Sequence, residues 1–142
     1  MPPEMVEPIT RLAQNLFICP PVLSQHAAIA AFDATDELED NVRRYARNRQ
    51  IVLAGLAEAG LTDVAPADGA FHAWVNIESL NLTSTELSAR WLRDISVAVT
   101  PGLDFDGTDG DRHIRISDAE STADIGEAMG RIVEWVGQRS QI

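Results

Sequence analysis

The segment Val97–Ala119, with the sequence VAVTPGLDFDGTDGDRHIRISDA, constrains the fold of this chain more than any other segment. Apolar residues alternate over 97–100 and again over 113–117, and this period of two predicts two half-buried β-strands. Pro101 and the glycine after it are expected to end the first strand, and the two Asp-Gly pairs that follow predict turns. The second strand therefore carries Arg115 on the face opposite to its two isoleucines.

The role of Arg115 has two interpretations at this point. An arginine on a strand is most often a surface charge. The planar fork of its guanidinium also suits bidentate binding of a carboxylate. A loop rich in Gly and Asp directly precedes the strand and would form the mouth of a cleft, which supports the second interpretation. The residues alone leave both open.

Apolar periodicity predicts helices and one further strand in the rest of the chain. Thr83 and Glu86 form a capping box, and Gly60 is a helix stop. Pro8 is expected in the first turn of its helix, where proline is tolerated. The predicted elements are two short helices within 1–34 around an extended Phe17–Pro21 segment, a long helix over 36–59, a strand over 70–77, a helix after Thr83, the strands at 97–100 and 113–117, and a helix from Ser121 or Thr122.

This order predicts an α+β fold, in which a small mixed or antiparallel sheet is covered on one face by helices. Residues 1–34 have little core of their own and are expected to form a helical connecting arm, followed by a compact domain over 35–142. In the helix after Thr83, the stripe expected to be buried is Leu87, Trp91, Leu92 and Ile95. In the long helix, a solvated face is expected for Arg43, Arg44, Arg47 and Arg49.

Composition and charge exclude several classes of function. The net charge of −11 over 142 residues argues against nucleic acid or an anionic membrane surface as a partner. No apolar run approaches the about 18 residues of a membrane span, and the acidic N-terminus lacks the basic and apolar regions of a signal peptide. A single cysteine cannot form an internal disulfide, which fits a reducing compartment. The chain is therefore expected to be cytoplasmic.

All eleven basic residues are arginine, and the chain contains no lysine. It therefore cannot form a Schiff base through a lysine side chain. The three histidines and Cys19 are scattered without metal-ligand spacing, so no metal site is predicted, and Cys19 is interpreted as a packed or loop thiol. The glycines match no nucleotide-binding fingerprint, and no serine lies in a G-x-S-x-G motif. The loop aspartates leave calcium as a minor alternative, since they lack EF-hand spacing.

A series of motifs in a fixed order resembles the C-terminal part of a class I/II aminotransferase, a fold-type-I pyridoxal-phosphate enzyme. The resemblance covers nearly the whole chain, and its specificity comes from the order of the motifs rather than from any one of them. The motifs are FICPPVLSQ at Phe17–Gln25, the helix with Tyr45, Arg49, Leu53, Leu56 and Gly60, PADGAFHAW at Pro66–Trp74, Leu92, VAVTPGLDF at Val97–Phe105, Gly110, and Ile114-Arg115-Ile116-Ser117.

The resemblance implies a role for Arg115, which occupies the R-[IL]-S motif whose arginine binds the α-carboxylate of the amino-acid substrate. It implies a small C-terminal domain that begins near residue 35 and moves over the substrate, and an arm over 1–34 that belongs to a large domain. Two departures, His72 in place of the usual tyrosine and Asp106 in place of a common glycine, bear on substrate choice. Residues that would line the active site are Cys19, Pro20, Pro21, His72 and Phe105.

The resemblance also implies pyridoxal 5′-phosphate as cofactor, an amino acid and a 2-oxo acid as substrates, and a homodimer in the intact enzyme. The family's Schiff-base lysine and cofactor-binding residues would lie N-terminal to residue 1. The chain is thus expected to be a fragment or a truncated reading frame that is inactive alone. Two alternatives stay open: a non-catalytic domain that binds carboxylates or another chain, and a decarboxylase or synthase of the same superfamily.

Treating the chain with pyridoxal phosphate and then with borohydride tests the consequence of having no lysine. We expect no reduced adduct on any side chain, because no side chain supplies a primary amine. Peptide mapping by mass spectrometry separates a side-chain adduct from one at the terminal amine of Met1. A reduced adduct on a side chain would contradict this expectation.

Overall fold

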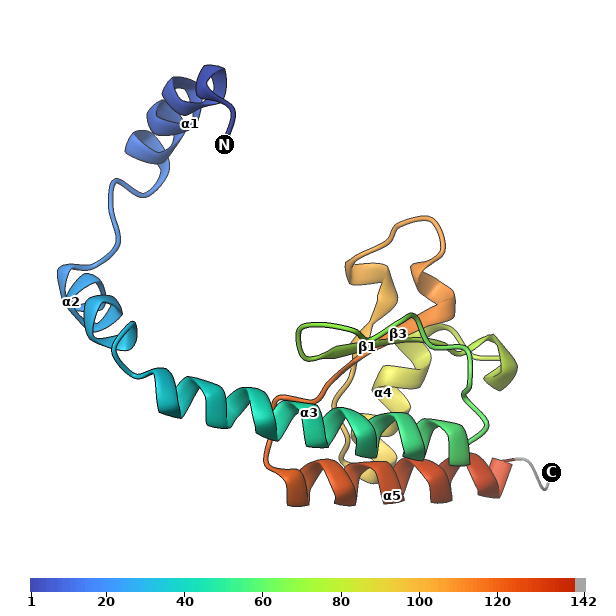
Figure 1. Ribbon diagram of the computed structural model, residues 1–142. Helices are drawn as coiled ribbons and strands as arrows, with labels where there is room; N and C mark the ends of the chain where they lie inside the picture. The colour runs from blue at the N-terminus through green and yellow to red at the C-terminus, as the bar shows by residue number, and fades with distance from the viewer. Residues whose placement is uncertain (140–142) are drawn as a thin grey trace. The chain divides into compact units, whose positions relative to one another are not determined.

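The structure, a computed structural model, describes residues 1–139. These residues form five α-helices, three short 3-10 helices and a three-stranded sheet, which confirms the predicted element order and the α+β class (Figure 1). None of the helices in this range combines the length and apolar character that crossing a membrane requires. The elements are α1 (Pro3–Leu16), α2 (Val22–Ala31), α3 (Thr35–Glu58), β1 (His72–Asn76), η1 (Glu78–Leu80), α4 (Ser84–Ile95), β2 (Thr100–Pro101), η2 (Gly102–Asp104), η3 (Gly110–Arg112), β3 (His113–Ser117) and α5 (Thr122–Arg139).

The chain divides into two compact units, Met1–Glu39 and a second unit that begins at Asp40. In the first unit, neither α1 nor α2 buries a single residue. Its structure is therefore local helix without a core. The large apolar side chains exposed in these two helices and the segments beside them are Met1, Met5, Val6, Leu12, Leu16, Phe17, Ile18, Val22, Leu23, Ile29 and Phe32.

Two local predictions for the first unit need correction. Pro8 lies inside α1 rather than in its first turn, because the helix already begins at Pro3, a position that favours proline. Since Pro8 has no N–H, α1 lacks one of its hydrogen bonds. The Phe17–Pro21 segment is not extended throughout: Ile18 has a left-handed φ of 61° and donates its N–H to the carbonyl of Ala13 at 2.9 Å. This bond closes the end of α1.

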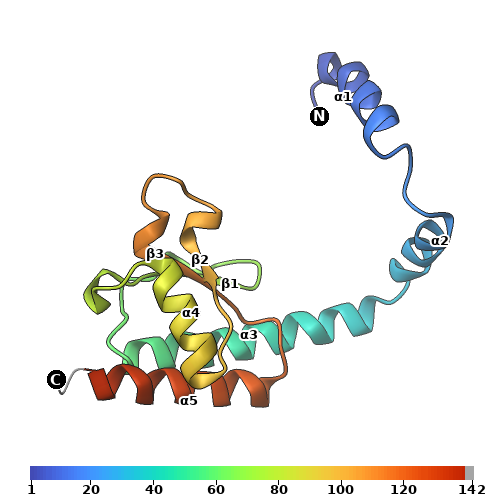
Figure 2. The same cartoon turned by 180° about the vertical axis from the view of Figure 1, so that it is seen from behind.

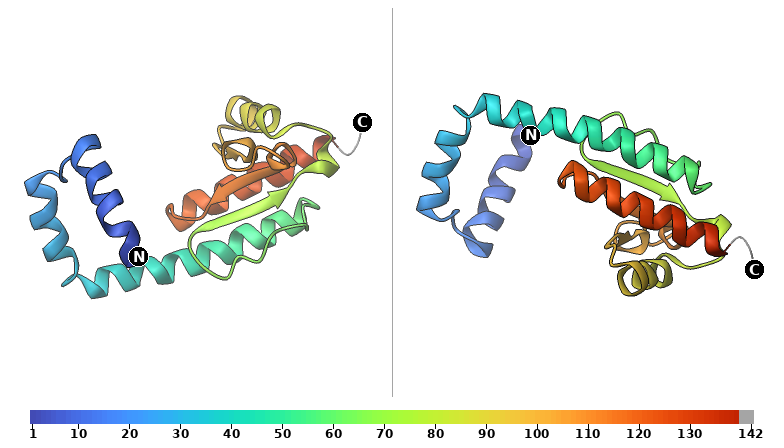
Figure 3. Two further views of the ribbon diagram at one scale, coloured as in Figure 1. Left: turned by 90° about the horizontal axis from the view of Figure 1, so that it is seen from above. Right: turned by 90° about the horizontal axis from the view of Figure 1, so that it is seen from below.

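The second unit has one hydrophobic core between the sheet and three helices. The strand order is β1-β3-β2, and both pairings are antiparallel. The helices α3, α4 and α5 all lie on one side of the sheet, with α3 and α5 side by side (Figure 2, Figure 3). This confirms the predicted cover on one face. The buried core consists of Val52, Leu56, Leu61, Ala73, Val75, Ile77, Leu87, Trp91, Val97, Ile114, Ile116, Ile125, Met129, Ile132 and Val136.

Helix boundaries follow the sequence signals. Gly60, with a φ of 77°, follows the end of α3. The capping box before α4 is formed as predicted, with Thr83 accepting from the N–H of Glu86 while the Glu86 carboxylate accepts from the N–H of Thr83. The prediction that Leu92 is buried is wrong, because its side chain is 59% exposed. The buried face of α4 is narrower than predicted and includes Ser88, which donates to a backbone carbonyl one turn earlier.

The strand predicted at 97–100 is wrong in position, since β2 consists of Thr100–Pro101 alone. Ser96 instead ends α4 with a left-handed φ of 55°, and Val97 donates its N–H to the carbonyl of Trp91 at 3.1 Å. The chain after α4 therefore closes the helix rather than pairing with the sheet. Proline is compatible with β2 because an edge strand does not need every N–H for pairing.

The loop between β2 and β3 is closed by the close approach of two glycines. A Cβ atom on Gly102 would lie 2.3 Å from the carbonyl oxygen of Gly110, and one on Gly110 would lie 2.4 Å from the carbonyl oxygen of Gly102. Both contacts are with backbone, which cannot rotate away as a side chain can. The third glycine of this loop, Gly107, has no atom within 4 Å of such a Cβ. The close approach of η2 and η3 thus requires glycine at two positions.

Gly102→Ala is expected to lower the free energy of unfolding by about 1–3 kcal/mol, the usual cost of overpacking, because backbone must move to admit the methyl group. The matched control, Gly107→Ala, should stay within about 1 kcal/mol of the wild type. Urea unfolding monitored by tryptophan fluorescence measures both values. Equal stability of the two variants would contradict the close approach of the two glycines.

Candidate functional site

The site lies on the face of the sheet that the helices leave open. In β1 and β3, the residues between the buried core positions are half-buried, and no α-helix of residues 40–139 covers them (Figure 3). Register places Trp74 of β1 directly opposite Arg115 of β3, with Thr100 of β2 on its other side. His72 and His113 lie on the same face, two residues from Trp74 and Arg115 respectively. The predicted alternation of β3 is confirmed.

One aromatic ring lies against the guanidinium of Arg115, and two further rings support it. Its Cζ lies 4.1 Å from the centroid of the Phe105 ring, which comes from the loop after η2. Phe105 contacts Trp74 edge to face, with centroids 6.2 Å apart and an interplanar angle of 83°. Trp74 in turn stacks on His113, at 5.2 Å and 13°. The guanidinium therefore rests on the Phe105 ring, which is itself held by Trp74 and His113.

The guanidinium of Arg115 has no hydrogen bond or ion pair with any other residue within 1–139. This is unexpected for a chain that contains 22 acidic residues, four of them in the loop just before β3. Its N–H donors are therefore not consumed by the described part of the chain, and they can bind a carboxylate. Five other arginines each pair with an acidic side chain: Arg11, Arg43, Arg93, Arg112 and Arg131.

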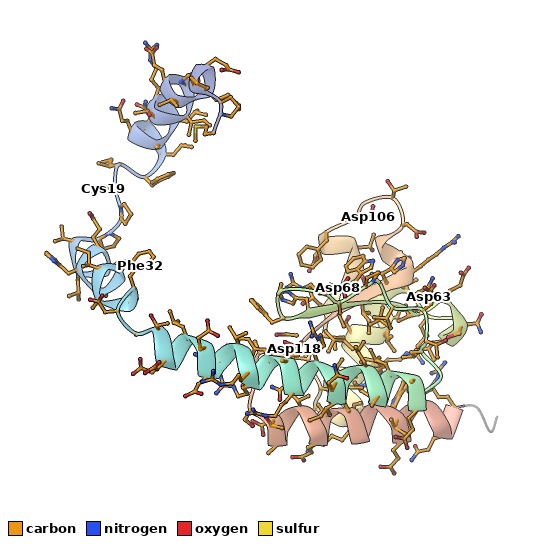
Figure 4. The ribbon with its side chains drawn as sticks, viewed as in Figure 1. Cys19, Phe32, Asp63, Asp68, Asp106 and Asp118 are labelled. Atoms are coloured by element: carbon orange, nitrogen blue, oxygen red, sulfur yellow. The ribbon has the colours of Figure 1, made fainter. Side chains whose placement is uncertain are left out.

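Three of the four aspartates before β3 have hydrogen-bond or ion-pair partners other than Arg115. Asp106, labelled in Figure 4 on the side of the sheet away from α5, accepts through Oδ1 from the N–H groups of Thr108 at 2.8 Å and Asp109 at 3.3 Å. These two hydrogen bonds lower the pKa of Asp106. Asp109 pairs with Arg112 at 3.5 Å, and Asp111 accepts from the start of α4. In residues 1–139, no three His, Cys, Asp or Glu side chains are grouped to hold a metal ion.

Two titratable groups at the end of the sheet have shifted pKa values. Burial, and then the positive charge of Arg115, lower the pKa of His72, against the opposing effect of Asp118. Burial raises the pKa of Asp118, against the opposing charges of Arg49 and His72. The Asp118 side chain is 4% exposed, and its Oδ1 has no hydrogen-bond partner among the described residues. Burial thus disfavours the charged form of this carboxylate more than its positively charged neighbours favour it.

A polar network that the sequence did not reveal joins α3 to this end of the sheet. Asn48 is fully buried, and its Nδ2 donates to the carbonyl oxygens of Asp118 and Glu120, both at 2.8 Å. Arg49 donates to the carbonyl of Ala67 at 2.7 Å. The prediction that Arg49 belongs to a solvated face is therefore wrong. Asn48 lies four positions before the buried Val52, on the same face of α3. This spacing was a usable signal that Asn48 is buried. Asp118 carried no comparable signal.

The predicted site residues fall into both units. His72, Phe105 and Arg115 lie in the second unit and on or over the same face of the sheet. Cys19 and its two neighbours Pro20 and Pro21 lie in the first unit, between α1 and α2, and are exposed (Figure 4). The alternation over 113–117 placed His113 on the same face of the strand as Arg115, but the sequence gave no reason to expect Trp74 opposite it.

The chain matches the family model for aminotransferase class I and II over residues 2–132. It belongs to this family. The valine–pyruvate aminotransferase of Mycobacterium tuberculosis (strain ATCC 25618 / H37Rv) is 42% identical over 127 residues, which are 88% of this chain and 33% of that protein. The (5-formylfuran-3-yl)methyl phosphate transaminase of Methanocaldococcus jannaschii is 36% identical over 137 residues, or 95% of this chain and 36% of that protein.

Solved structures of aminotransferases have the same fold. The crystal structure of an aminotransferase from Mycobacterium tuberculosis superposes with a TM-score of 0.86 and 39% sequence identity, covering 97% of this chain and 36% of that one. The chain thus spans about a third of the length of the aminotransferases that it matches. The candidate site of this chain therefore corresponds only to the part of an active site that the matching third of such an enzyme supplies.

Asp118→Asn is expected to change how stability depends on pH. Because the pKa of Asp118 is raised on folding, the folded state holds the proton more tightly, and the contribution of Asp118 to wild-type stability falls as pH rises from the unfolded pKa of about 3.9 through the raised value. Asparagine does not titrate, so the stability gained by the variant should grow over this window and then level off. Urea unfolding at pH 3.5 to 7.5 measures it.

Asp63→Asn, which replaces an exposed carboxylate, is the matched control with which the profile of Asp118→Asn is compared. A variant Asp118→Asn whose profile is parallel to that of the wild type would show that burial does not dominate at this carboxylate.

Proposed function

We propose that this chain forms the substrate-carboxylate side of a pyridoxal-phosphate-dependent aminotransferase, in which Arg115 binds the α-carboxylate of an amino acid and of a 2-oxo acid. The observation that supports this is an arginine on a paired strand, next to an aromatic layer, with no acidic partner among the described residues. The guanidinium of such an arginine has two adjacent N–H donors available for two parallel N–H···O bonds to one carboxylate.

The chemical task of Arg115 is orientation. Two parallel hydrogen bonds fix the plane of the carboxylate and hence the direction of the bonds at the adjacent carbon, which converts a loose encounter into a defined geometry. Strand β3 makes this orientation rigid, because it is hydrogen-bonded on both sides. When bound, the family's cofactor supplies the electron sink for moving the amino group. The residues of this chain do not fit its covalent attachment, since none is a lysine.

The proposal also assigns a role to each of the two parts of the chain. Residues 1–34 would be a helical arm that packs with a large domain, and residues 35–142 the small domain that closes over the substrate. The exposed apolar side chains of α1 and α2 support this assignment, because such surface is normally buried against another part of the molecule. The intact enzyme would be a cytoplasmic homodimer, with Cys19, Pro20 and Pro21 near its active site.

A second candidate is a domain that binds small carboxylates without catalysis. The observation that favours it is again the absence of lysine, which leaves the chain without an amine for the cofactor. Both candidates assign the same ligand chemistry to Arg115. They differ in whether binding leads to transfer of an amino group.

A chimaera separates the two candidates. In the valine–pyruvate aminotransferase of Mycobacterium tuberculosis, this chain would replace the aligned third, and transfer from L-valine to pyruvate would be measured. We expect activity, and we expect Arg115→Lys to lower kcat/KM about ten- to a hundredfold, the loss of about 1.5–3 kcal/mol from charged hydrogen bonds that lysine cannot reproduce.

Arg93→Lys is the matched control for that substitution, because Arg93 is exposed and pairs with Asp94 in the same chain. It should leave kcat/KM unchanged. An unchanged kcat/KM for Arg115→Lys would remove Arg115 from the carboxylate site. An inactive but folded chimaera, together with pyruvate binding by the isolated chain that needs Arg115, would support the second candidate.

A further inference from the structure

We propose that Phe105 is a positioning residue that holds the Arg115 guanidinium ready for a carboxylate, and that the loop over 102–112 is built to keep Phe105 in place. The proposal rests on the carboxylate-binding role proposed above for Arg115. It adds a residue and a device to that site, and both follow from contacts within the second unit.

The first step concerns how an unpaired arginine can be held still. A carboxylate from the protein would fix the guanidinium of Arg115 but would occupy the donors that a substrate needs. A ring fixes it through its face, at 4.1 Å from Cζ, and occupies no N–H group. The Arg115 guanidinium has no ion pair among residues 1–139 and is in contact with this ring. A guanidinium that is oriented in advance and keeps its donors free for a carboxylate requires both.

The second step concerns what holds the ring. The Phe105 side chain is 54% exposed, so burial alone does not fix it. Its contact with Trp74 is edge to face, the preferred geometry for two aromatic rings. Trp74 stacks on His113, whose Nδ1 lies 3.0 Å from the carbonyl oxygen of Asp109. The ring is thus supported by a series of contacts that begins on β1 and returns to the loop that carries Phe105.

The third step concerns the backbone of that loop. Phe105 and Asp106 both donate their N–H groups to the carbonyl of Gly102, at 2.9 and 3.0 Å, and Gly110 donates to the carbonyl of Asp106 at 3.0 Å. The contact between Gly102 and Gly110 closes the base of the loop. The segment that carries the ring is therefore hydrogen-bonded at both ends.

The fourth step concerns the side chain of Asp106. Its Oδ1 accepts two backbone N–H groups within the loop, from Thr108 and Asp109, which no glycine at this position could do. Asp106 thus stiffens the segment that follows Phe105. The residue that departs from the usual family pattern has a structural task next to the proposed carboxylate site.

The experiment uses the full chain and NMR spectroscopy. The first readout is the chemical shift of the Arg115 δ-protons, which the ring of Phe105 displaces upfield. Phe105→Leu should remove this displacement, and Phe105→Tyr should keep it. The second readout is the dissociation constant of pyruvate, followed at the Arg115 Nε–H. We expect Phe105→Leu to weaken binding about two- to fivefold, the loss of one exposed cation–π contact, and Phe105→Tyr to stay within about twofold of the wild type.

Phe71→Leu is the matched control, since Phe71 is an exposed aromatic residue just before β1 whose ring contacts within residues 1–139 are with Tyr45 and His72. It should change neither readout. If Phe105→Leu does not fold, Asp106→Gly carries the test: it keeps the ring but frees the loop, and it should broaden the Arg115 Nε–H signal and weaken pyruvate binding.

The outcomes distinguish this proposal from the function on which it rests. Loss of pyruvate binding in Arg115→Lys, with full binding and unchanged Arg115 shifts in Phe105→Leu, would overturn only the role of Phe105. The same holds if the shifts change but the affinity does not. Absence of pyruvate binding by the wild-type chain, or full binding by Arg115→Lys, would contradict the carboxylate site itself.

Discussion

The antiparallel pairing of β1 with β3 is the interaction on which the rest of the second unit depends. It buries the alternate residues Ile114 and Ile116 against three helices, and the same alternation turns Arg115 to the open face. A shift of the strand register by one residue would exchange the two faces of β3. Burial of the two isoleucines therefore fixes the face of the sheet on which Arg115 lies. The strand partner supplies Trp74 at the opposite position, which gives the arginine an aromatic neighbour without any contribution from the helices.

Elements with strong local signals were predictable from the sequence. The Thr83–Glu86 capping box, the helix stop at Gly60 and the alternation over 113–117 each depend on residues a few positions apart, and all three occur in the structure. Where a local signal competes with another, prediction failed. Val97 has the pattern of a strand, but its N–H closes α4, because the end of a helix leaves carbonyl groups that need donors.

The central residue of the candidate site could be proposed from the sequence, but the contacts around it could not. Arg115 stands out from the motif and the alternation, whereas its contact with Phe105 depends on how a closed loop folds back over the sheet. The bonds from Asn48 to the turn after β3 join positions about seventy residues apart, and no pattern in one segment reveals them. Such contacts are set by tertiary packing, which fixes both the buried amide and the Asp118 Oδ1 that has no hydrogen-bond partner among residues 1–139.

The helices α1 and α2 bury none of their residues, and this has a consequence for how the chain behaves in solution. Helices of 14 and 10 residues are marginal in water without packing, so their backbone opens independently of the sheet. We therefore expect a protease to cleave the first unit of this chain before the second unit unfolds. We also expect amide hydrogens in the first unit to exchange rapidly, and the cooperative heat absorption on melting to come from the unit that begins at Asp40.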